Sequence, residues 1–319
     1  MKKSILAVLA SVLLLSAVTL GMTNACSSSK ALVTDDEGRS LTFDGPVSSI
    51  VSLAPSTTEI VFAVGAGDRL IGRTDYCNYP PEAASVESVG GFYDPNKEKI
   101  VALEPDVVLA TGMHYQTGDA AWLEEKGLKV LILKPHTLDD VMEHIALVGK
   151  LTGKEAEAAS LVESLQSRID YVTERTAGLA DSQRPSVLHI TWHDPLWTVG
   201  EGSFAHALIE AAGGVNVFAD IAEADAQVNL DTAVARDPEV ITVSTGHGDA
   251  MSEPYNWVIA SDSPFRETSA YKSDRVHLVD ADLVSRGGPR IVDALEPVSY
   301  THLRAHETSL HLVCRLLLE

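Results

Sequence analysis

Apolar residues along this chain fall into short runs typical of buried strands and longer stretches with helical spacing. The short runs lie at 50–53, 70–73, 107–111 and 129–133, and again at 186–190, 240–243 and 276–279. Helices are expected between them, near 57–64, 96–103, 118–126 and 204–212. Because strands and helices alternate, the pattern predicts an α/β fold with a mostly parallel sheet in each half.

Two stretches of the chain repeat each other at a fixed spacing. Residues 56–67 run from a small polar start through an apolar helix to glycines, and residues 203–214 do the same at equal length. Glu98 and Asp231 each lie seven residues before a proline that opens the next apolar run. Chance repetition of strand and helix patterns is the alternative explanation. The repeat favours two similar lobes with a cleft between them, where small molecules bind.

A long helical pattern separates the two halves. From 154 to 176 the apolar residues recur on one face, at Ala158, Leu161, Val162, Leu165, Ile169 and Val172. Thr152 followed by Glu155 is a capping-box signature and predicts a helix start. About 23 residues give a helix of roughly 35 Å. We expect a helical linker over 138–180 that is stiff and permits only small closing motions, although an ordinary core helix has the same pattern.

The first 25 residues have the pattern of an export signal. Lys2 and Lys3 precede an uncharged apolar run of 16 residues, 5–20. A bilayer-spanning helix needs about 20 residues, so this run predicts a cleaved signal peptide over 1–25 rather than an anchor helix.

Cys26 opens a Cys-Ser-Ser-Ser segment that resembles the lipobox of bacterial lipoproteins, although Thr23 stands where a leucine is usual. We expect lipidation of Cys26 and a tether and linker over 26–43, with plain cleavage after Ala25 as the alternative. Several acyl chains on one cysteine would give stable anchoring. The expected location is the periplasm or the cell surface, with the membrane reached through the lipid.

After residue 296 the sequence changes character. Residues 298–308 resemble a translated sequencing adaptor, so we expect 298–319 to be a non-native tail and the second lobe to be truncated at its last helix. His302 and His306 in this tail have the i,i+4 spacing of a zinc pair. Because these two histidines belong to the expected non-native tail, we assign no metal site to them.

The composition of the chain and the motifs that it lacks limit the possible classes of function. The 24 Lys plus Arg against 45 Asp plus Glu give a net charge of −21, which argues against a nucleic-acid partner, since that needs clustered positive charge. Cys77 is expected to be a small buried hydrophobe. The chain shows no Gly-x-Gly-x-x-Gly after its first strand, no nucleophile elbow and no Walker loop. We therefore expect that the protein is not an enzyme. The alternative from another functional class is a metal-dependent α/β enzyme.

Three segments carry a family resemblance: 50–59 (Ile-Val-Ser-Leu-Ala-Pro-Ser-Thr-Thr-Glu), 75–82 (Asp-Tyr-Cys-Asn-Tyr-Pro-Pro-Glu) and 98–106 (Glu-Lys-Ile-Val-Ala-Leu-Glu-Pro-Asp). They resemble class III substrate-binding proteins of ABC importers, a family with binders of vitamin B12, haem and ferric siderophores. The resemblance implies two Rossmann-like lobes, 44–137 and 181–296, joined by the long helix. Segment 75–82 is most like the cobalamin-binding branch. A corrinoid ligand is therefore implied, with haem or a ferric siderophore as alternatives and no intrinsic cofactor.

The resemblance also implies a partner. In the family, one carboxylate at the top of each lobe docks into arginine pockets on the two permease subunits, and the matching positions here are Glu98 and Asp231. The implied partners are an ABC permease dimer and its ATPase subunits, met by a monomeric binding protein. Complementary charges of this kind set orientation and on-rate. Both acids also suit the first turn of any helix.

Candidate ligand-binding residues lie in the loops expected to face the cleft. Ser56 and Thr57 offer hydroxyls and free amides at a helix start, which suit amide or anionic groups or merely cap the helix. The other candidates are mostly aromatic, because flat rings suit a flat macrocycle: Phe92, Tyr93, Tyr115, Trp192, His193, Trp197 and Arg286. Trp197 fits the core equally well. Tyr93 or His193 would ligate iron if the ligand were haem, and Arg286 could pair with a propionate or phosphate.

Overall fold

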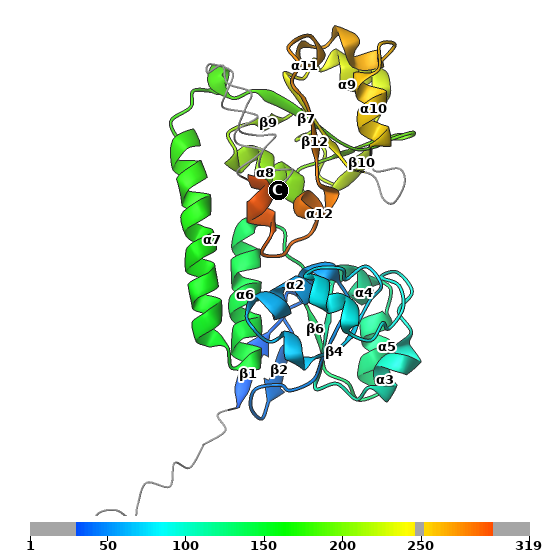
Figure 1. The fold of residues 1–319 in the computed structure, drawn as a ribbon, viewed down its shortest axis with the longest axis vertical. Coiled ribbons are helices and arrows are strands. Elements are labelled where there is room, and N and C mark those ends of the chain that lie inside the picture. The colour runs from blue at the N-terminus through cyan, green and yellow to red at the C-terminus, as the bar shows by residue number, and fades with distance from the viewer. Residues whose placement is uncertain (1–29, 246–251, 296–319) are drawn as a thin grey trace, which may run out of the picture.

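The computed structural model describes residues 30–245 and 252–295, which form two α/β lobes stacked along the long axis of the molecule (Figure 1). The expected signal peptide 1–25, the lipidation site Cys26 and the expected non-native tail 298–319 lie outside the described residues, and these assignments stay predictions. Among the helices of the described ranges, none is both long and apolar enough to cross a bilayer.

The N-terminal lobe is built on a fully parallel sheet with the strand order β4-β3-β5-β6. Its strands are β3 (Ile50–Ser52), β4 (Leu70–Arg73), β5 (Val107–Ala110) and β6 (Val130–Ile132). Every residue of β3, β5 and β6 is buried, as expected for parallel strands covered on both faces. The lobe's helices are α2 (Pro55–Ala63), α3 (Lys97–Ala102), α4 (Gly112–Gln116) and α5 (Asp119–Glu125), with 3-10 turns at Gly67–Arg69 and Pro81–Ser85.

The C-terminal lobe has a mixed sheet with the order β10-β8-β7-β11-β12, and β9 also pairs with β7. Its strands are β7 (Ser186–His193), β8 (Leu196–Val199), β9 (Val215–Asn216), β10 (Asp225–Gln227), β11 (Val240–Ser244) and β12 (Val276–Val279). The β8 and β10 strands are antiparallel additions to a parallel centre. The lobe's helices are α8 (Phe204–Ala211), α9 (Leu230–Ala235), α10 (Glu253–Ile259), α11 (Ser269–Lys272) and α12 (Ala281–Ser285), with 3-10 turns at Asp181–Gln183 and Pro264–Glu267.

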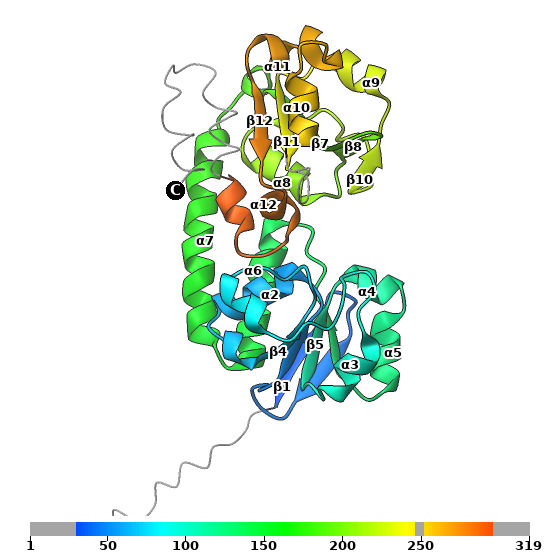
Figure 2. The same cartoon turned by 45° about the vertical axis from the view of Figure 1, so that its right-hand side comes forward.

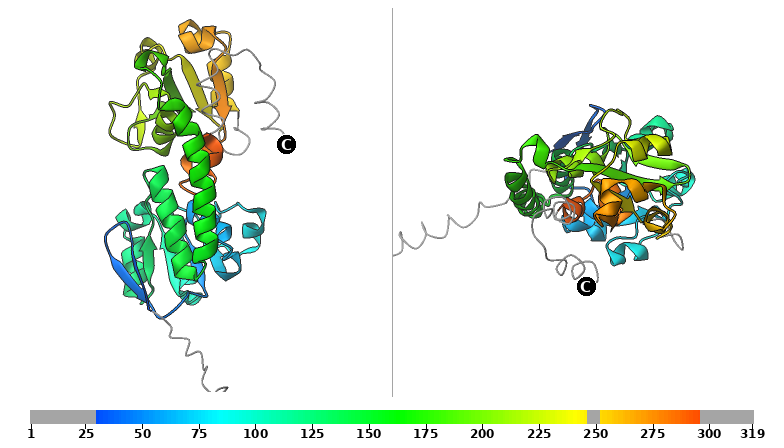
Figure 3. Two further views of the ribbon diagram at one scale, coloured as in Figure 1. Left: turned by 90° about the vertical axis from the view of Figure 1, so that its left-hand side faces the viewer. Right: turned by 90° about the horizontal axis from the view of Figure 1, so that it is seen from above.

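Two helices, α6 (Leu138–Thr152) and α7 (Glu155–Thr176), connect the lobes, and α7 runs along one side of both (Figures 1 and 3). The 22 residues of α7 correspond to about 33 Å. The capping box predicted at Thr152 and Glu155 is wrong. Thr152 ends α6, where its Oγ1 donates to the Val148 carbonyl at 2.7 Å. Gly153, at φ 64°, supplies the left-handed residue that stops α6.

Residues 31–43, expected to belong to the linker 26–43, instead form a β-hairpin of β1 (Ala31–Thr34) and β2 (Ser40–Phe43). Val33 and Phe43 are its buried apolar residues, and both join the core that contains α6. Asp35 closes the turn by accepting hydrogen bonds of 2.6 and 2.9 Å from the Arg39 guanidinium. With only two buried apolar residues on either side of a charged turn, the alternation of apolar and polar positions is too weak to identify these strands from the sequence.

One hydrophobic core crosses from lobe to lobe. It joins Ile60 of α2 and the inner faces of α6 and α7 to Leu208 of α8 and to the C-terminal residues Val284, Ile291 and Leu295. Contacts between loosely coupled domains are smaller and more polar than this. The lobes are therefore held by shared packing as well as by α7, which strengthens the expectation of a stiff connection.

The carboxyl ends of the two sheets face each other. In the N-terminal lobe α2 and α4, which follow β3 and β5, lie next to the other lobe, whereas α3 lies at the far end (Figures 1 and 2). In the C-terminal lobe α12, which follows β12, lies next to the N-terminal lobe, whereas α9 and α11 lie at the far end. Open α/β sheets bind ligands outside their carboxyl ends, so the region between the lobes is the expected ligand site.

Candidate ligand site and docking surface

The hydroxyl of Thr57 is committed to the turn between β3 and α2. Thr57 is buried, and its Oγ1 lies 2.6 Å from Oγ of Ser52 and donates to the Ala54 carbonyl at 3.0 Å. Ser56 is half-buried and lies beside the chain that returns from the other lobe, where a Cβ on Gly288 would be 3.4 Å from the Ser56 Cα. Thr57 therefore positions the helix start, and Ser56 lies at the contact between the lobes.

Phe92 and Tyr93 are held by a histidine that the sequence analysis did not select. The Phe92 ring lies edge-on to Tyr93 at 5.0 Å and to His114 at 5.1 Å. Nε2 of His114 is 3.0 Å from the Phe92 carbonyl, and Nδ1 is 2.9 Å from Oγ1 of Thr111. Burial lowers the pKa of the His114 imidazole, which favours its neutral form. This support leaves Tyr93 with 74% of its surface exposed.

Tyr115 is presented on the neighbouring helix α4, close to His114. Its ring is 44% exposed, and the Arg39 guanidinium lies over it at 5.5 Å from the centroid. Arg39 is itself paired with Asp35 and with Glu124, each at 2.6 Å. The N-terminal lobe thus carries three of the predicted aromatic residues, Phe92, Tyr93 and Tyr115, and the charge of the cation beside Tyr115 is already compensated.

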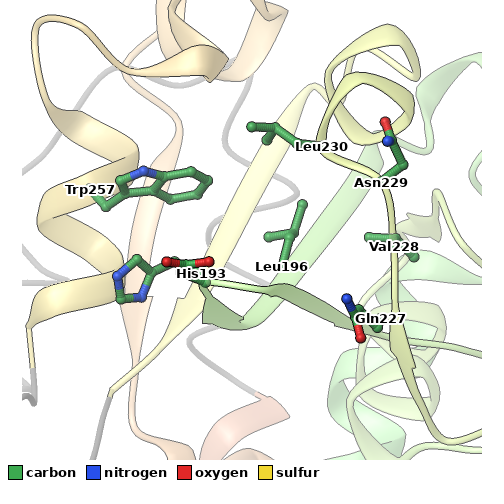
Figure 4. Close-up of a pocket in the computed structure, with 8 residues that line it drawn as sticks. His193, Leu196, Gln227, Val228, Asn229, Leu230 and Trp257 are labelled. Atoms are coloured by element: carbon green, nitrogen blue, oxygen red, sulfur yellow. The ribbon is translucent and has the colours of Figure 1, made fainter.

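A pocket of about 770 Å³ opens at the end of β7 in the C-terminal lobe (Figure 4). We call it the C-lobe pocket, and it is lined by His193, Asp194, Leu196, Gln227, Val228, Asn229, Leu230 and Trp257. His193 lies 5.7 Å from the Trp257 ring, and its side chain is 13% exposed. His193 Nδ1 is buried with no hydrogen-bond partner among the described residues. A buried polar atom without a partner costs about 1–3 kcal/mol, which favours a polar group in this pocket.

The two predicted tryptophans do not line the C-lobe pocket. In the β7–β8 ladder Trp192 pairs with Trp197, and His193 pairs with Leu196. Successive residues of a strand point to opposite faces, so the tryptophans lie on the face away from His193 and Leu196. Trp192 Nε1 donates to the Asp194 carbonyl at 3.0 Å, and Trp197 is 36% exposed. Trp257, which the sequence analysis did not select, provides the aromatic wall instead.

Arg286 is part of a charged network between the lobes. Its Nη1 donates to Glu59 Oε1 at 3.2 Å and to Asn78 Oδ1 at 2.8 Å, and its Nη2 lies 2.7 Å from Oδ1 of Asp282. Arg290 donates to both oxygens of Glu59, at 2.9 and 2.7 Å. We call Glu59, Asn78, Asp282, Arg286 and Arg290 the Glu59 network. Sequence reasoning selected only Arg286 from it.

The Glu59 network is well buried. The Glu59 side chain is 2% exposed, and those of Arg286 and Arg290 are 13% and 18% exposed. The Arg290 guanidinium also lies over the Tyr79 ring at 3.9 Å. Burial opposes the charge of Arg290, but the hydrogen bonds and the negative charge of Glu59 outweigh it and raise the pKa of the guanidinium. Arg290 therefore keeps its positive charge in spite of its burial.

The expected docking acids occupy equivalent places in the two lobes. Glu98 and Asp231 are exposed residues in the first turns of α3 and α9. Each helix is capped by an asparagine, Asn96 accepting from the Lys99 amide at 2.9 Å and Asn229 from the Thr232 amide at 3.2 Å. In Figures 1 and 2 both helices lie on the side of the molecule opposite α7, at the outer ends of the lobes.

The internal repeat continues beyond these helices. Glu104 and Asp237, which lie six residues after Glu98 and Asp231, both have a positive φ, at 47° and 42°. Two residues further on, each lobe has an acid that accepts a hydrogen bond from the amide of a serine at or just before the start of a strand. Asp106 accepts from the Ser48 amide at 2.7 Å, and Glu239 accepts from the Ser186 amide at 2.9 Å. The two lobes thus share side-chain detail as well as topology, which favours one structural unit used twice.

Comparison with known proteins identifies the family of the chain. A model of the family described as periplasmic binding protein matches residues 50–283. The chain belongs to this family. It is 30% identical over 272 residues to the uncharacterized ABC transporter substrate-binding lipoprotein YvrC of Bacillus subtilis, covering 84% of this chain and 83% of that protein. It is 28% identical over 253 residues to the vitamin B12-binding protein of Vibrio cholerae, covering 79% and 88%.

A solved structure supports the same placement. The periplasmic vitamin B12 binding protein BtuF of Vibrio cholerae superposes with a TM-score of 0.71 at 27% identity, covering 82% of this chain and 99% of that one. The predicted family and fold class, two α/β lobes joined by a long helix, are confirmed. Proteins of this periplasmic binding protein family serve transporters and are not enzymes.

Proposed function

We propose that this periplasmic binding protein captures a corrinoid between its lobes and delivers it to the permease of an ABC importer. The observation that carries the proposal is the arrangement of two sheets with facing carboxyl ends, bordered by aromatic residues, in a chain related to vitamin B12-binding proteins. A broad, mostly apolar ring with amide side chains suits such surroundings. In the N-terminal lobe Tyr115 lies in α4, which borders this region, and Phe92 packs on His114 of the same helix and on Tyr93.

The C-lobe pocket is a separate polar site, on the face of the C-terminal sheet that packs against α9 and α10. Gln227 and Asn229 both line it, and Oδ1 of Asn229 is already used as the cap of α9.

Binding measurements with three ligands test this proposal. The purified protein is titrated with cyanocobalamin, cobinamide and haemin, following heat by calorimetry and the ligand by visible spectroscopy. We expect both corrinoids to bind with one site per chain. Binding of haemin alone, with the spectrum of a tyrosinate or imidazole iron ligand, would assign the site to haem. A failure of all three ligands to bind would end the proposal.

We further propose that Glu98 and Asp231 dock the loaded protein onto the two halves of the permease. Both residues are exposed, and the helices that carry them, α3 and α9, lie on one side of the molecule, as a two-fold partner requires. Exposed acids of this kind contribute orientation and on-rate to association rather than ligand affinity. The variant Glu98→Lys with Asp231→Lys should abolish uptake in cells and leave corrinoid affinity unchanged.

The control variant carries the same change of charge on the opposite side. Glu163 and Glu174 are exposed residues of α7, so Glu163→Lys with Glu174→Lys should leave uptake unchanged. Loss of corrinoid affinity in the Glu98 and Asp231 variant would assign these acids to the ligand site instead. Equal loss of uptake in both double variants would mean that net charge, and not position, governs docking.

A further inference from the structure

The Glu59 network lies where the two lobes meet, on the carboxyl-end side of both sheets. Glu59 and Asn78 come from the N-terminal lobe, whereas Asp282, Arg286 and Arg290 come from α12 and the chain after it. The backbone between the arginines is confined as well. A Cβ on Gly287 would come within 2.6 Å of the Phe204 ring, and one on Gly288 within 3.4 Å of Ser56. The two guanidiniums are thus fixed beside the proposed ligand site.

The charges of this network cancel. Arg286 is paired with Glu59 at 3.2 Å and with Asp282 at 2.7 Å, and Arg290 is paired with Glu59 at 2.7 Å. Two guanidiniums therefore face two carboxylates. Arginine is the side chain best suited to bind a ligand carboxylate or phosphate through a bidentate contact. Here Glu59 already receives that contact from Arg290, and the remaining donors of Arg286 are directed to Asp282 and Asn78.

A further cation beside the predicted aromatic residues of the N-terminal lobe is compensated in the same way. Arg39, which lies over Tyr115, is paired with Asp35 and Glu124. A ligand with several ionised carboxylates would lose its hydration at this site without gaining an uncompensated cation.

We infer that Glu59 and Asp282 set the charge class of the ligand by withholding Arg286 and Arg290 from it. The site then takes a macrocycle whose side groups are uncharged amides and disfavours one that bears carboxylates. This inference rests on the proposed function, because it requires the ligand to bind between the lobes. Removing one of the two acids leaves the network with a net positive charge and converts it into a site for an anionic side group.

Two matched ligands test the inference: cyanocobalamin, and the cyanocobalamin monocarboxylic acid in which one propionamide is hydrolysed. They differ by a single negative charge at pH 7.5. We expect the wild-type protein to bind the amide form more tightly, because the carboxylate loses its hydration and meets no uncompensated cation. Asp282→Asn leaves the network with a net charge of +1 and should shift the ratio of the two affinities about tenfold toward the acid, the effect of one charge acting over about 12 Å at an effective dielectric constant of about 20. Added salt should weaken this shift.

Two further variants control the measurement. Glu59→Gln should shift the preference in the same direction as Asp282→Asn. The Asp282 side chain is 31% exposed, so Asp282→Asn disturbs the fold less and still tests the inference if Glu59→Gln does not fold. Glu210→Gln removes an acid that pairs with Arg184 and should leave the preference unchanged.

The outcomes separate the inference from the proposed function. A wild-type protein that binds both ligands equally, or that prefers the acid, overturns the inference while the corrinoid function stands. An unchanged preference in both Asp282→Asn and Glu59→Gln does the same. If the wild-type protein binds neither ligand, the proposed function itself fails.

Discussion

Replacing His189 by glutamine should remove part of the acid sensitivity of folding. His189 lies in β7, in the centre of the C-terminal sheet, with Nδ1 2.9 Å from Oγ1 of Thr242 and Nε2 3.0 Å from Oγ of Ser244. Burial lowers the pKa of this imidazole from 6.5 to about 4. The folded protein therefore keeps His189 neutral at a pH where the unfolded chain already takes up a proton.

The sign and size of the effect follow from this difference. Because the folded-state pKa is depressed, the stabilising contribution is complete above pH 6.5 and is lost as the pH falls toward 4. A gap of about 2.5 pKa units corresponds to about 3 kcal/mol in full. About 2 kcal/mol of this is lost between pH 7 and pH 5.

Urea unfolding at pH 7, 6 and 5 measures this loss in the wild-type protein and in His189→Gln. Glutamine can still bond both hydroxyls but does not titrate, so the free energy of unfolding of the wild type should fall by about 2 kcal/mol more than that of the variant. His136→Gln, at an exposed histidine, should follow the wild type. Parallel curves for wild type and His189→Gln would refute the reasoning, because His189 would then not be the group that titrates.

Three further predictions concern the site, the network and export. Tyr93→Ala should weaken corrinoid binding about tenfold at unchanged stability, because the ring is 74% exposed, and calorimetry should show no such loss for the exposed Tyr171→Ala of α7. Glu59→Gln should lower the free energy of unfolding by about 3 kcal/mol in urea, since two buried guanidiniums lose their shared partner; a change under about 1 kcal/mol would mean that water replaces it. Cys26→Ala should move the protein from the membrane to the soluble fraction, whereas Cys77→Ala should not.

Local patterns were the part of the fold that the sequence predicted well. The repeat around Glu98 and Asp231 depends on a capping residue, a short helix and a proline within about ten positions, and both lobes form it alike. The parallel strands β3, β4, β5, β6, β7, β11 and β12 were also recognised, since continuous apolar runs between turn residues are typical of such strands. The strands β8, β9 and β10 were not predicted. The capping box at Thr152 failed because the same hydroxyl satisfied a carbonyl of the preceding helix.

Side-chain partners far apart in sequence were the part that could not be predicted. Glu59 and Arg290 are 231 residues apart, so no spacing rule connects them. The sequence analysis selected Arg286 as a ligand-binding candidate, but it did not identify the acids that occupy the donors of Arg286. Trp192 and His193 are neighbours in sequence, yet they lie on opposite faces of the sheet. The strand register decides which of the two lines the pocket, and the sequence alone does not give that register.

The stiffness of the connection explains why the paired charges matter for recognition. A protein that closes widely around its ligand can bring new donors to it, because hinge motion moves side chains by many ångströms. Here α7, the core shared between the lobes and the Glu59 network all oppose such motion. The polar groups that meet the ligand must then be in place before it arrives, as preorganised sites require. Under that constraint, neutralising Arg286 and Arg290 in the free protein fixes the charge that an arriving ligand meets.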